Sequence, residues 1–233
     1  MAPWVPSVLV FGPRISAFGQ FWQVLTATIQ VEFTGLKPPF VTGKDLILAV
    51  IAELGVGGAV NHVLEFVGPG AEALSIDERL AVANMAVKAG AETGLFPADP
   101  VTMQFLAGRA RYPGTAERSD ADAEFARGIQ PDLGRLSTPV GLPHSPEDVA
   151  SVEAVAGRKV DQVYIGNCAN GTTTDLRQTA EVLRGGGGCT GTVGLLSFRR
   201  LAGFTFRQLV KALSTSLLKQ GQWPLHQPVG PAW

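Results

Sequence analysis

The segment of residues 160–185 reads VDQVYIGNCANGTTTDLRQTAEVLRG and decides the fold class. Its apolar run predicts a short buried strand near residues 161–166. Thr172 and Asp175, three residues apart, form a variant of the capping box, which predicts a helix near residues 173–184. The apolar stripe of this helix consists of Leu176, Ala180 and Leu183. A strand followed by a polar loop and a helix predicts an α/β fold.

Cys168 lies in the polar loop between this strand and this helix. In open α/β sheets, ligands bind at the carboxyl ends of the strands, and the amides and dipole of a helix N-terminus favour a thiolate. A single cysteine at such a position is more often a small buried residue. The glycines nearby match neither a dinucleotide-binding fingerprint nor a phosphate-binding loop. On these residues alone we favour a structural cysteine over a ligand.

The region before this segment contains three helix starts and one alternating strand. Thr42, Ser75 and Asp99 are helix-capping residues that precede apolar stripes, and Pro100 suits the first turn of a helix. These signals predict helices at residues 43–54, 75–90 and 99–108, and apolar alternation predicts a strand at residues 28–34. The glycine, proline and aspartate content of residues 113–135 predicts a surface connection, where we place a domain boundary.

Composition excludes several classes of protein. The chain has 233 residues, of which 45% are hydrophobic and 17% are charged, so it can bury a core in one or two domains. A net charge of −1 offers no general attraction for nucleic acid. No uninterrupted apolar run reaches the roughly 18 residues of a membrane span. Two cysteines are too few for a disulfide scaffold, so we expect a reducing, cytoplasmic location.

The end of the chain differs in charge from the rest. Residues 186–233 carry five basic and no acidic side chains, whereas residues 1–185 carry 14 basic and 20 acidic ones. Apolar spacing predicts a helix within residues 203–219. A basic amphipathic helix can bind a membrane or a partner. For this helix we favour an accidental pattern over such binding. The charge difference itself can equally mark an interaction tail or a segment of different origin, such as a shifted reading frame.

Matching motifs between residues 27 and 185 carry a family resemblance. In chain order they are IQVEFTG at 29–35, KDLIL at 44–48, EF at 65–66, ALS at 73–75, NMAV at 84–87, GLFPAD at 94–99, LPHSP at 142–146, VAG at 155–157, DQV at 161–163 and IGNCANG at 165–171. This pattern resembles the aconitase superfamily, and within it the large subunits of 3-isopropylmalate dehydratase and homoaconitase.

The resemblance implies a division of the chain and a fold for its parts. It implies incomplete aconitase-type α/β/α three-layer domains. The parts are an unmatched N-terminal segment at 1–27, an α/β domain at 28–112, the first part of a second α/β domain at 113–185, and an unmatched basic tail at 186–233. The second of these domains carries Cys168.

The resemblance also implies an activity, a cofactor and a partner. The family contains hydro-lyases that move a hydroxyl group between adjacent carbons of a small hydroxy-acid, in leucine or lysine biosynthesis. Three cysteinates hold a [4Fe–4S] cluster, whose open iron binds the substrate. Cys168 matches the first of these metal ligands, and Asn84 and Asn170 match positions around the cluster and substrate. The partner implied is a separate small swivel-domain subunit, with no nucleic acid and no membrane.

Three departures from the family pattern affect the site. The Cys-x-x-Cys segment that supplies the other two ligands is absent, and Cys189 has no cysteine three residues later. Lys88 stands where the family has a glutamate, four residues after Asn84, which reverses the charge beside the metal site. Asn167 and Ala169 replace two hydroxyl residues beside the cysteine. We therefore expect a truncated, inactive copy. The alternative is a non-catalytic remnant that acts as a binding module or has no function.

Other polar residues have structural interpretations. His144 lies in a Pro-His-Ser-Pro loop, and we interpret it as a turn residue rather than a catalytic group. Arg109 and Arg111 follow a predicted helix, where a cation interacts favourably with the helix dipole. We therefore favour a surface position over substrate binding for these two arginines.

Overall fold

The computed structural model describes residues 25–110, 114–158, 162–185 and 192–195. The chain forms two compact units, Met1–Arg158 and Lys159–Trp233. The domain boundary that we placed near residue 113 differs from this division, because residues beyond 113 return to the sheet of the first unit. The helix predicted within residues 203–219 lies outside the described residues.

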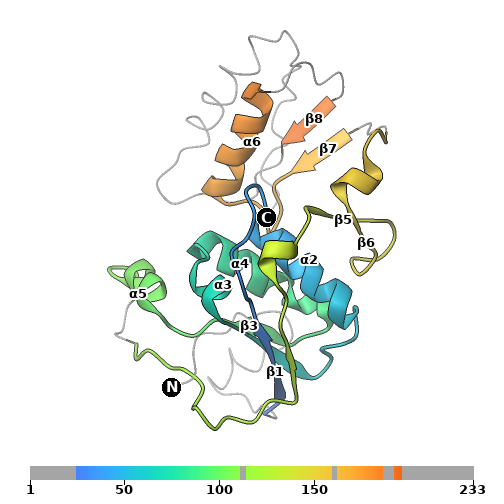
Figure 1. Ribbon diagram of the computed structural model, residues 1–233. Helices are drawn as coiled ribbons and strands as arrows, with labels where there is room; N and C mark the ends of the chain where they lie inside the picture. Colours follow the sequence, from blue (N-terminus) through green and yellow to red (C-terminus); the bar gives the residue numbers. More distant parts are fainter. Residues whose placement is uncertain (1–24, 111–113, 159–161, 186–191, 196–233) are drawn as a thin grey trace, which may run out of the picture. The chain divides into compact units, whose positions relative to one another are not determined.

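A parallel sheet is the centre of the first unit (Figure 1). Its strands are β1 (Ala27–Glu32), β2 (His62–Val67), β3 (Thr93–Leu95) and β4 (Arg127–Ile129), in the order β3-β2-β1-β4. β1 and β2 pair from Ala27 opposite His62 to Glu32 opposite Val67. The predicted strand at 28–34 is confirmed, although β1 ends at Glu32. The other three strands were not predicted.

The three helices predicted in the first unit are confirmed. They are α2 (Gly43–Leu54), α4 (Ile76–Met85) and α5 (Pro100–Leu106). A short helix, α3 (Pro69–Glu72), precedes α4. After Met85 the chain continues as a 3₁₀ turn, η1 (Ala86–Ala89), and Gly90 in the left-handed conformation ends it. The helix predicted at 75–90 is therefore α-helical only as far as Met85.

Small elements follow the main sheet. They are η2 (Leu133–Arg135), the antiparallel pair β5 (Pro139–Gly141) and β6 (Val149–Ser151), and η3 (Val152–Val155). The second unit contains β7 (Gln162–Ile165), α6 (Thr173–Gly185) and β8 (Thr192–Leu195), with β7 and β8 parallel. β7 and α6 confirm the strand and helix predicted from residues 160–185. Of the helices in the described ranges, none has the length and hydropathy needed to cross a bilayer.

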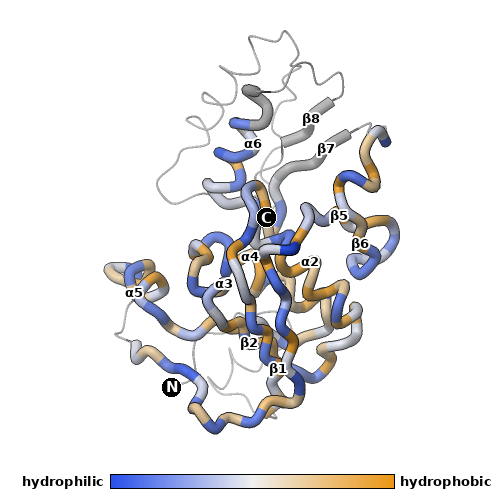
Figure 2. Tube along the Cα trace, viewed as in Figure 1, coloured by the Kyte–Doolittle hydropathy of each residue, from blue (hydrophilic) through white to orange (hydrophobic). Residues whose placement is uncertain are grey.

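The core of the first unit lies between one face of the sheet and the helices α2 and α4. Figure 2 shows hydrophobic residues along α2 and the strands. The rings of Phe33 and Phe66 stack with centroids 5.7 Å apart. Other fully buried side chains include Ile29, Val31, Leu46, Ile47, Ile51 and Leu64. The two helices approach closely at Gly43, where a Cβ atom would lie 2.5 Å from the carbonyl oxygen of Glu78. Glycine therefore permits this packing.

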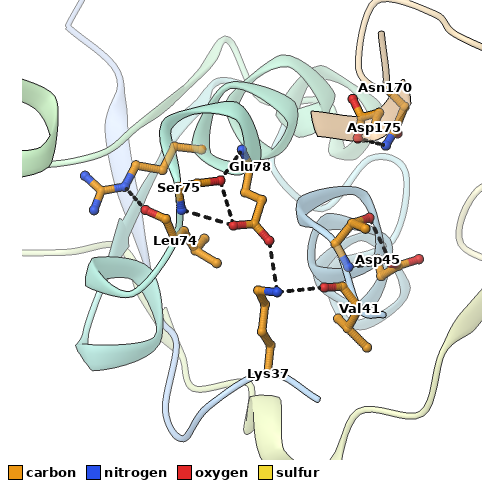
Figure 3. Close-up of polar contacts among 10 residues, drawn as sticks. Lys37, Val41, Asp45, Leu74, Ser75, Glu78, Asn170 and Asp175 are labelled. Carbon is orange, nitrogen blue, oxygen red and sulfur yellow. Dashed lines mark hydrogen bonds and ion pairs between the residues drawn. The ribbon is translucent and has the colours of Figure 1, made fainter. Parts of the chain in front are cut away.

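Polar contacts at the helix starts fix how α2 and α4 begin. The Asp45 carboxylate accepts hydrogen bonds from the amide and hydroxyl of Thr42 at 2.7 and 2.9 Å, while burial raises the pKa of Asp45. Ser75 and Glu78 form the second capping box. Lys37 donates to the carbonyl of Val41 at 3.0 Å and lies 3.1 Å from Glu78 (Figure 3). Lys37 thus links the starts of the two helices.

A buried ion pair joins α4 to the start of α5. Arg79 is 4% exposed, and its two terminal nitrogens donate to the two carboxylate oxygens of Asp99 at 2.8 and 2.7 Å. These hydrogen bonds hold the pKa of Asp99 well below its usual range. Asp99 is also the N-cap of α5, because it accepts a hydrogen bond from the amide of Thr102 at 2.9 Å.

Removing the negative charge of this pair should destabilise the first unit. Asp99→Asn leaves the Arg79 guanidinium buried without a counter-ion, so we expect the free energy of unfolding at pH 7 to fall by about 3–5 kcal/mol. The folded-state pKa of Asp99 lies below the unfolded value. Its stabilisation is therefore complete above about pH 4 and is lost as the pH falls further. The difference in the free energy of unfolding between wild type and variant should be constant from about pH 7 to 5 and shrink below about pH 4.

Urea unfolding, monitored by circular dichroism, measures this difference in the free energy of unfolding. Asp122→Asn, which changes an exposed carboxylate, is the matched control and should leave stability almost unchanged. A loss below about 1 kcal/mol in Asp99→Asn at pH 7 would contradict the role of the buried pair, because that is the effect of an exposed ion pair.

Candidate functional site

The loop that carries Cys168 is built by local hydrogen bonds. The side-chain oxygen of Asn167 accepts from the amides of Ala169 and Asn170 at 2.9 and 2.8 Å, which is the geometry of an Asx turn. A Cβ atom at Gly171 would lie 2.8 Å from the carbonyl oxygen of Asn167, so the tight turn requires glycine there. Each of these residues is close in sequence, and the loop is therefore encoded locally.

The predicted capping box at the start of α6 is present. The Asp175 carboxylate accepts from the amide and hydroxyl of Thr172 at 2.9 and 2.7 Å, and the Asp175 amide donates to the Thr172 hydroxyl at 3.2 Å. Asn170 donates from its side-chain amide to the other oxygen of Asp175 at 3.2 Å (Figure 3). The side-chain oxygen of Asn170 is buried and has no hydrogen-bond partner within the described residues. One acceptor in this loop is thus left unsatisfied.

Cys168 is exposed, and Ala169 beside it is buried. The interpretation that we favoured from the local residues alone, a small buried cysteine, is therefore wrong. Ala169 in the loop and Leu176 in α6 are buried instead, at 6% and 1% exposure. An exposed thiol at the carboxyl end of a strand and beside a helix N-terminus is accessible to a metal or an electrophile.

The other two predicted site residues lie in the first unit. Asn84 is in the last turn of α4, and Lys88 is in the 3₁₀ turn η1. Both side chains are exposed. The structure therefore places Cys168 and Asn170 in one loop of the second unit, and Asn84 and Lys88 at exposed positions four residues apart in the first unit.

The donor set of this chain does not complete a three-cysteinate cluster site. The sequence contains two cysteines, Cys168 and Cys189, and Cys189 lies outside the described residues. Within the part of the chain that the structure describes, no three side chains of histidine, cysteine, aspartate or glutamate are grouped to hold a metal ion. A [4Fe–4S] cluster of the aconitase type needs three thiolates, and the two cysteines of this sequence cannot supply them all.

Arg109 and His144 have the positions expected of surface residues. Arg109 is exposed and donates to the carbonyl of Phe105 at 2.7 Å at the end of α5, with its guanidinium 4.6 Å from the Phe105 ring. His144 is exposed in the loop between β5 and β6. Arg111 lies outside the described residues.

The first unit contains a cavity of about 440 Å³ that the sequence did not reveal. Its lining comes from β1 and β2, the start of α4, the residues that follow β3, and the connection to β4. Glu65 of β2 lines it and is 8% exposed. Ser119, which lies 54 residues later, donates its hydroxyl to the Glu65 carboxylate. Glu65 appeared in the sequence only as part of a matching motif, and no local signal linked it to Ser119.

A parallel α/β unit and a strand–loop–helix segment with an exposed cysteine define an α/β protein with one candidate metal-ligating loop. The model of the aconitase family (aconitate hydratase) matches residues 16–159, so the chain belongs to the aconitase family. This match begins within the N-terminal segment 1–27 that we left unmatched. It ends before Cys168, whose loop is matched by the motifs given above.

Curated relatives extend this assignment. The chain is 64% identical over 169 residues to 3-isopropylmalate dehydratase large subunit 2 of Rubrobacter xylanophilus. It is 40% identical over 169 residues to the 3-isopropylmalate dehydratase large subunit of Clostridium kluyveri, and 40% identical over 171 residues to large subunit 1 of Pyrococcus furiosus. Each alignment covers 72% of this chain and 40% of the relative. The chain therefore spans about two fifths of the length of these relatives.

The exposure of Cys168 can be tested with a thiol reagent. In a Cys189→Ser variant, Cys168 is the one remaining cysteine. We expect it to react with dithiobisnitrobenzoate without denaturant, at a rate comparable with that of the urea-unfolded chain, because its side chain is exposed. Absorbance of the released thiolate measures the rate. A Cys168→Ser, Cys189→Ser variant supplies the background. Reaction only after unfolding would show that Cys168 is buried.

Proposed function

We propose that this chain forms part of a hydro-lyase large subunit of the 3-isopropylmalate dehydratase type and that Cys168 is one of its cluster ligands. The observation that carries the proposal is the exposed thiol of Cys168 between β7 and α6, in the motif that resembles the cluster-binding loop of the family. The high identity to a relative with that name supports the same assignment.

The chain's own residues have limited roles in this proposal. Cys168 would supply one thiolate, and the capping box of Thr172 and Asp175 holds its loop in place. The unsatisfied oxygen of Asn170 is an acceptor close to that thiolate in sequence. Two further thiolates are required for a three-cysteinate cluster, and the described donor set does not contain them. We therefore assign no catalytic step to this chain.

Lys88 supports the second part of the proposal, that this chain by itself does not turn over substrate. The family resemblance implies a carboxylate at this position, which can orient a substrate or accept a proton. An ammonium group at pH 7 carries the opposite charge and accepts no proton. The alternative function is that of a non-catalytic binding module, and the observation that favours it is Lys88.

The names of the relatives guide the proposed substrate and partner. They favour 3-isopropylmalate and leucine biosynthesis over homoaconitate and lysine biosynthesis. The words "large subunit" in those names suggest a small-subunit partner. A cytoplasmic location belongs to the same proposal, because a cysteine that ligates a metal must remain reduced.

Anaerobic reconstitution with iron and sulfide tests the proposed inactivity. We expect the purified chain to develop no stable absorbance near about 400 nm, because two cysteines cannot supply three cluster thiolates. We also expect no turnover of isopropylmalate, homoaconitate or citrate, with or without a small subunit. The Rubrobacter xylanophilus relative, reconstituted in parallel, is the control for the procedure. About four irons per chain, or measurable dehydratase activity, would contradict this part of the proposal.

A further inference from the structure

The cavity of the first unit contains a buried carboxylate, Glu65, to which the proposed hydro-lyase role assigns no part. The cavity has a volume of about 440 Å³, within the range of sites for small ligands. Glu65 and Gln30 lie opposite each other on β2 and β1 and both line it. Phe66, the neighbour of Glu65, also contributes to the lining, and its ring packs near Gly94 and the helix α4. Because side chains alternate along a strand, Glu65 faces the other side of the sheet.

Arg79 also lines the cavity but has no capacity for a ligand. Its three nitrogens donate to the carbonyls of Leu74 and Glu72 at 3.1 and 3.0 Å, to both carboxylate oxygens of Asp99, and to the Thr102 hydroxyl at 3.2 Å. A guanidinium group has five N–H donors, so these contacts use all of them. The charges of Arg79 and Asp99 also neutralise each other.

Glu65, in contrast, retains unused acceptor capacity. The Ser119 hydroxyl lies 2.9 and 2.7 Å from its two carboxylate oxygens. A hydroxyl has one hydrogen, whereas an ionised carboxylate has about four acceptor positions. No ion pair of Glu65 occurs among the residues that the structure describes. Burial of an ionised carboxylate is costly unless a cation or several donors compensate it.

The remaining charges of the lining favour a cation. Apart from the pair of Arg79 and Asp99, the charged side chains that line the cavity are Glu65, Glu72, Asp120 and Arg118. Outside that pair, the lining therefore has three carboxylates and one guanidinium group. This excess attracts a positive ligand and disfavours an anionic hydroxy-acid. Phe96, Pro97 and Phe125 add apolar surface that can pack against a hydrocarbon group.

We propose that this cavity binds a small organic ammonium ion. The nitrogen donates hydrogen bonds to the Glu65 carboxylate and supplies the missing counter-charge. The hydrocarbon part packs against Phe125 and the neighbouring apolar lining. Neither Asn84 nor Lys88 lines the cavity, so the proposal does not depend on the proposed hydro-lyase role.

Calorimetric titration of the full 233-residue chain with benzylammonium tests this proposal. Benzyl alcohol and benzoate are the matched neutral and anionic probes, since they keep the ring and change the charge. We expect benzylammonium to bind with a millimolar or lower Kd, and the two other probes to bind at least about tenfold more weakly, because they cannot form a charge-assisted hydrogen bond to Glu65. Equal affinity for the three probes, or no binding of benzylammonium, would overturn the proposal.

Variants locate the binding. Glu65→Gln keeps the size of the side chain and removes its charge, and should weaken benzylammonium binding by about tenfold or more. Glu124→Gln removes an exposed carboxylate that does not line the cavity and should leave the affinity unchanged. Ala121→Phe keeps Glu65 but fills part of the cavity from an exposed position, so it should also weaken binding. Unchanged affinity in both Glu65→Gln and Ala121→Phe would show that benzylammonium binds elsewhere.

Discussion

The buried guanidinium of Arg79 is the interaction on which the first unit depends. It contacts the end of α3 through Glu72, the following turn through Leu74, and the start of α5 through Asp99 and Thr102. These segments all follow the carboxyl ends of β2 and β3. One side chain therefore holds together the edge of the sheet where α/β proteins bind ligands. Because its donors are all used internally, it shapes the cavity there and leaves Glu65 as the buried charge available to a ligand.

The loop that carries Cys168 in the second unit depends on shorter-range contacts. The Asx turn of Asn167 and the capping box of Thr172 and Asp175 involve residues no more than three positions apart. These contacts bury Ala169 and leave Cys168 exposed. A loop of this kind can present a thiolate without help from distant segments. What it cannot supply is the second and third thiolates of a cluster, which must come from other positions.

The separation along the chain between contacting residues explains which features could be predicted from the sequence. Four of the five predicted helices lie among the described residues, and each was found because it begins with a local capping signal: a capping box in three of them, and Asp99 followed by Pro100 in α5. β4 was missed because three residues, Arg127–Ile129, form a strand only by pairing with β1, about a hundred positions earlier. Glu65 with Ser119, and Arg79 with Asp99, are also long-range pairs, so the cavity left no local pattern.

The prediction for Cys168 used two kinds of information, the local sequence pattern and the family motif. The local pattern located the residue at the end of a strand, but the general tendency of single cysteines favoured burial, which the structure contradicts. Only the family motif pointed to a ligand. At Lys88 the signal again came from the family motif: η1 places this residue at an exposed position, and the resemblance implies a side chain of the opposite charge there. Helix packing does not depend on the charge of an exposed residue, so the fold alone does not reveal a changed charge there.

The iron content of a chimera tests most directly whether Cys168 is a cluster ligand. In this chimera the matching residues of this chain replace their counterpart in the Rubrobacter xylanophilus large subunit, whose remaining part is kept. After anaerobic reconstitution, the account predicts about four irons per chain in the chimera and a clear loss of iron in its Cys168→Ser variant. Equal iron content in the chimera and the Cys168→Ser variant would contradict the assignment of Cys168.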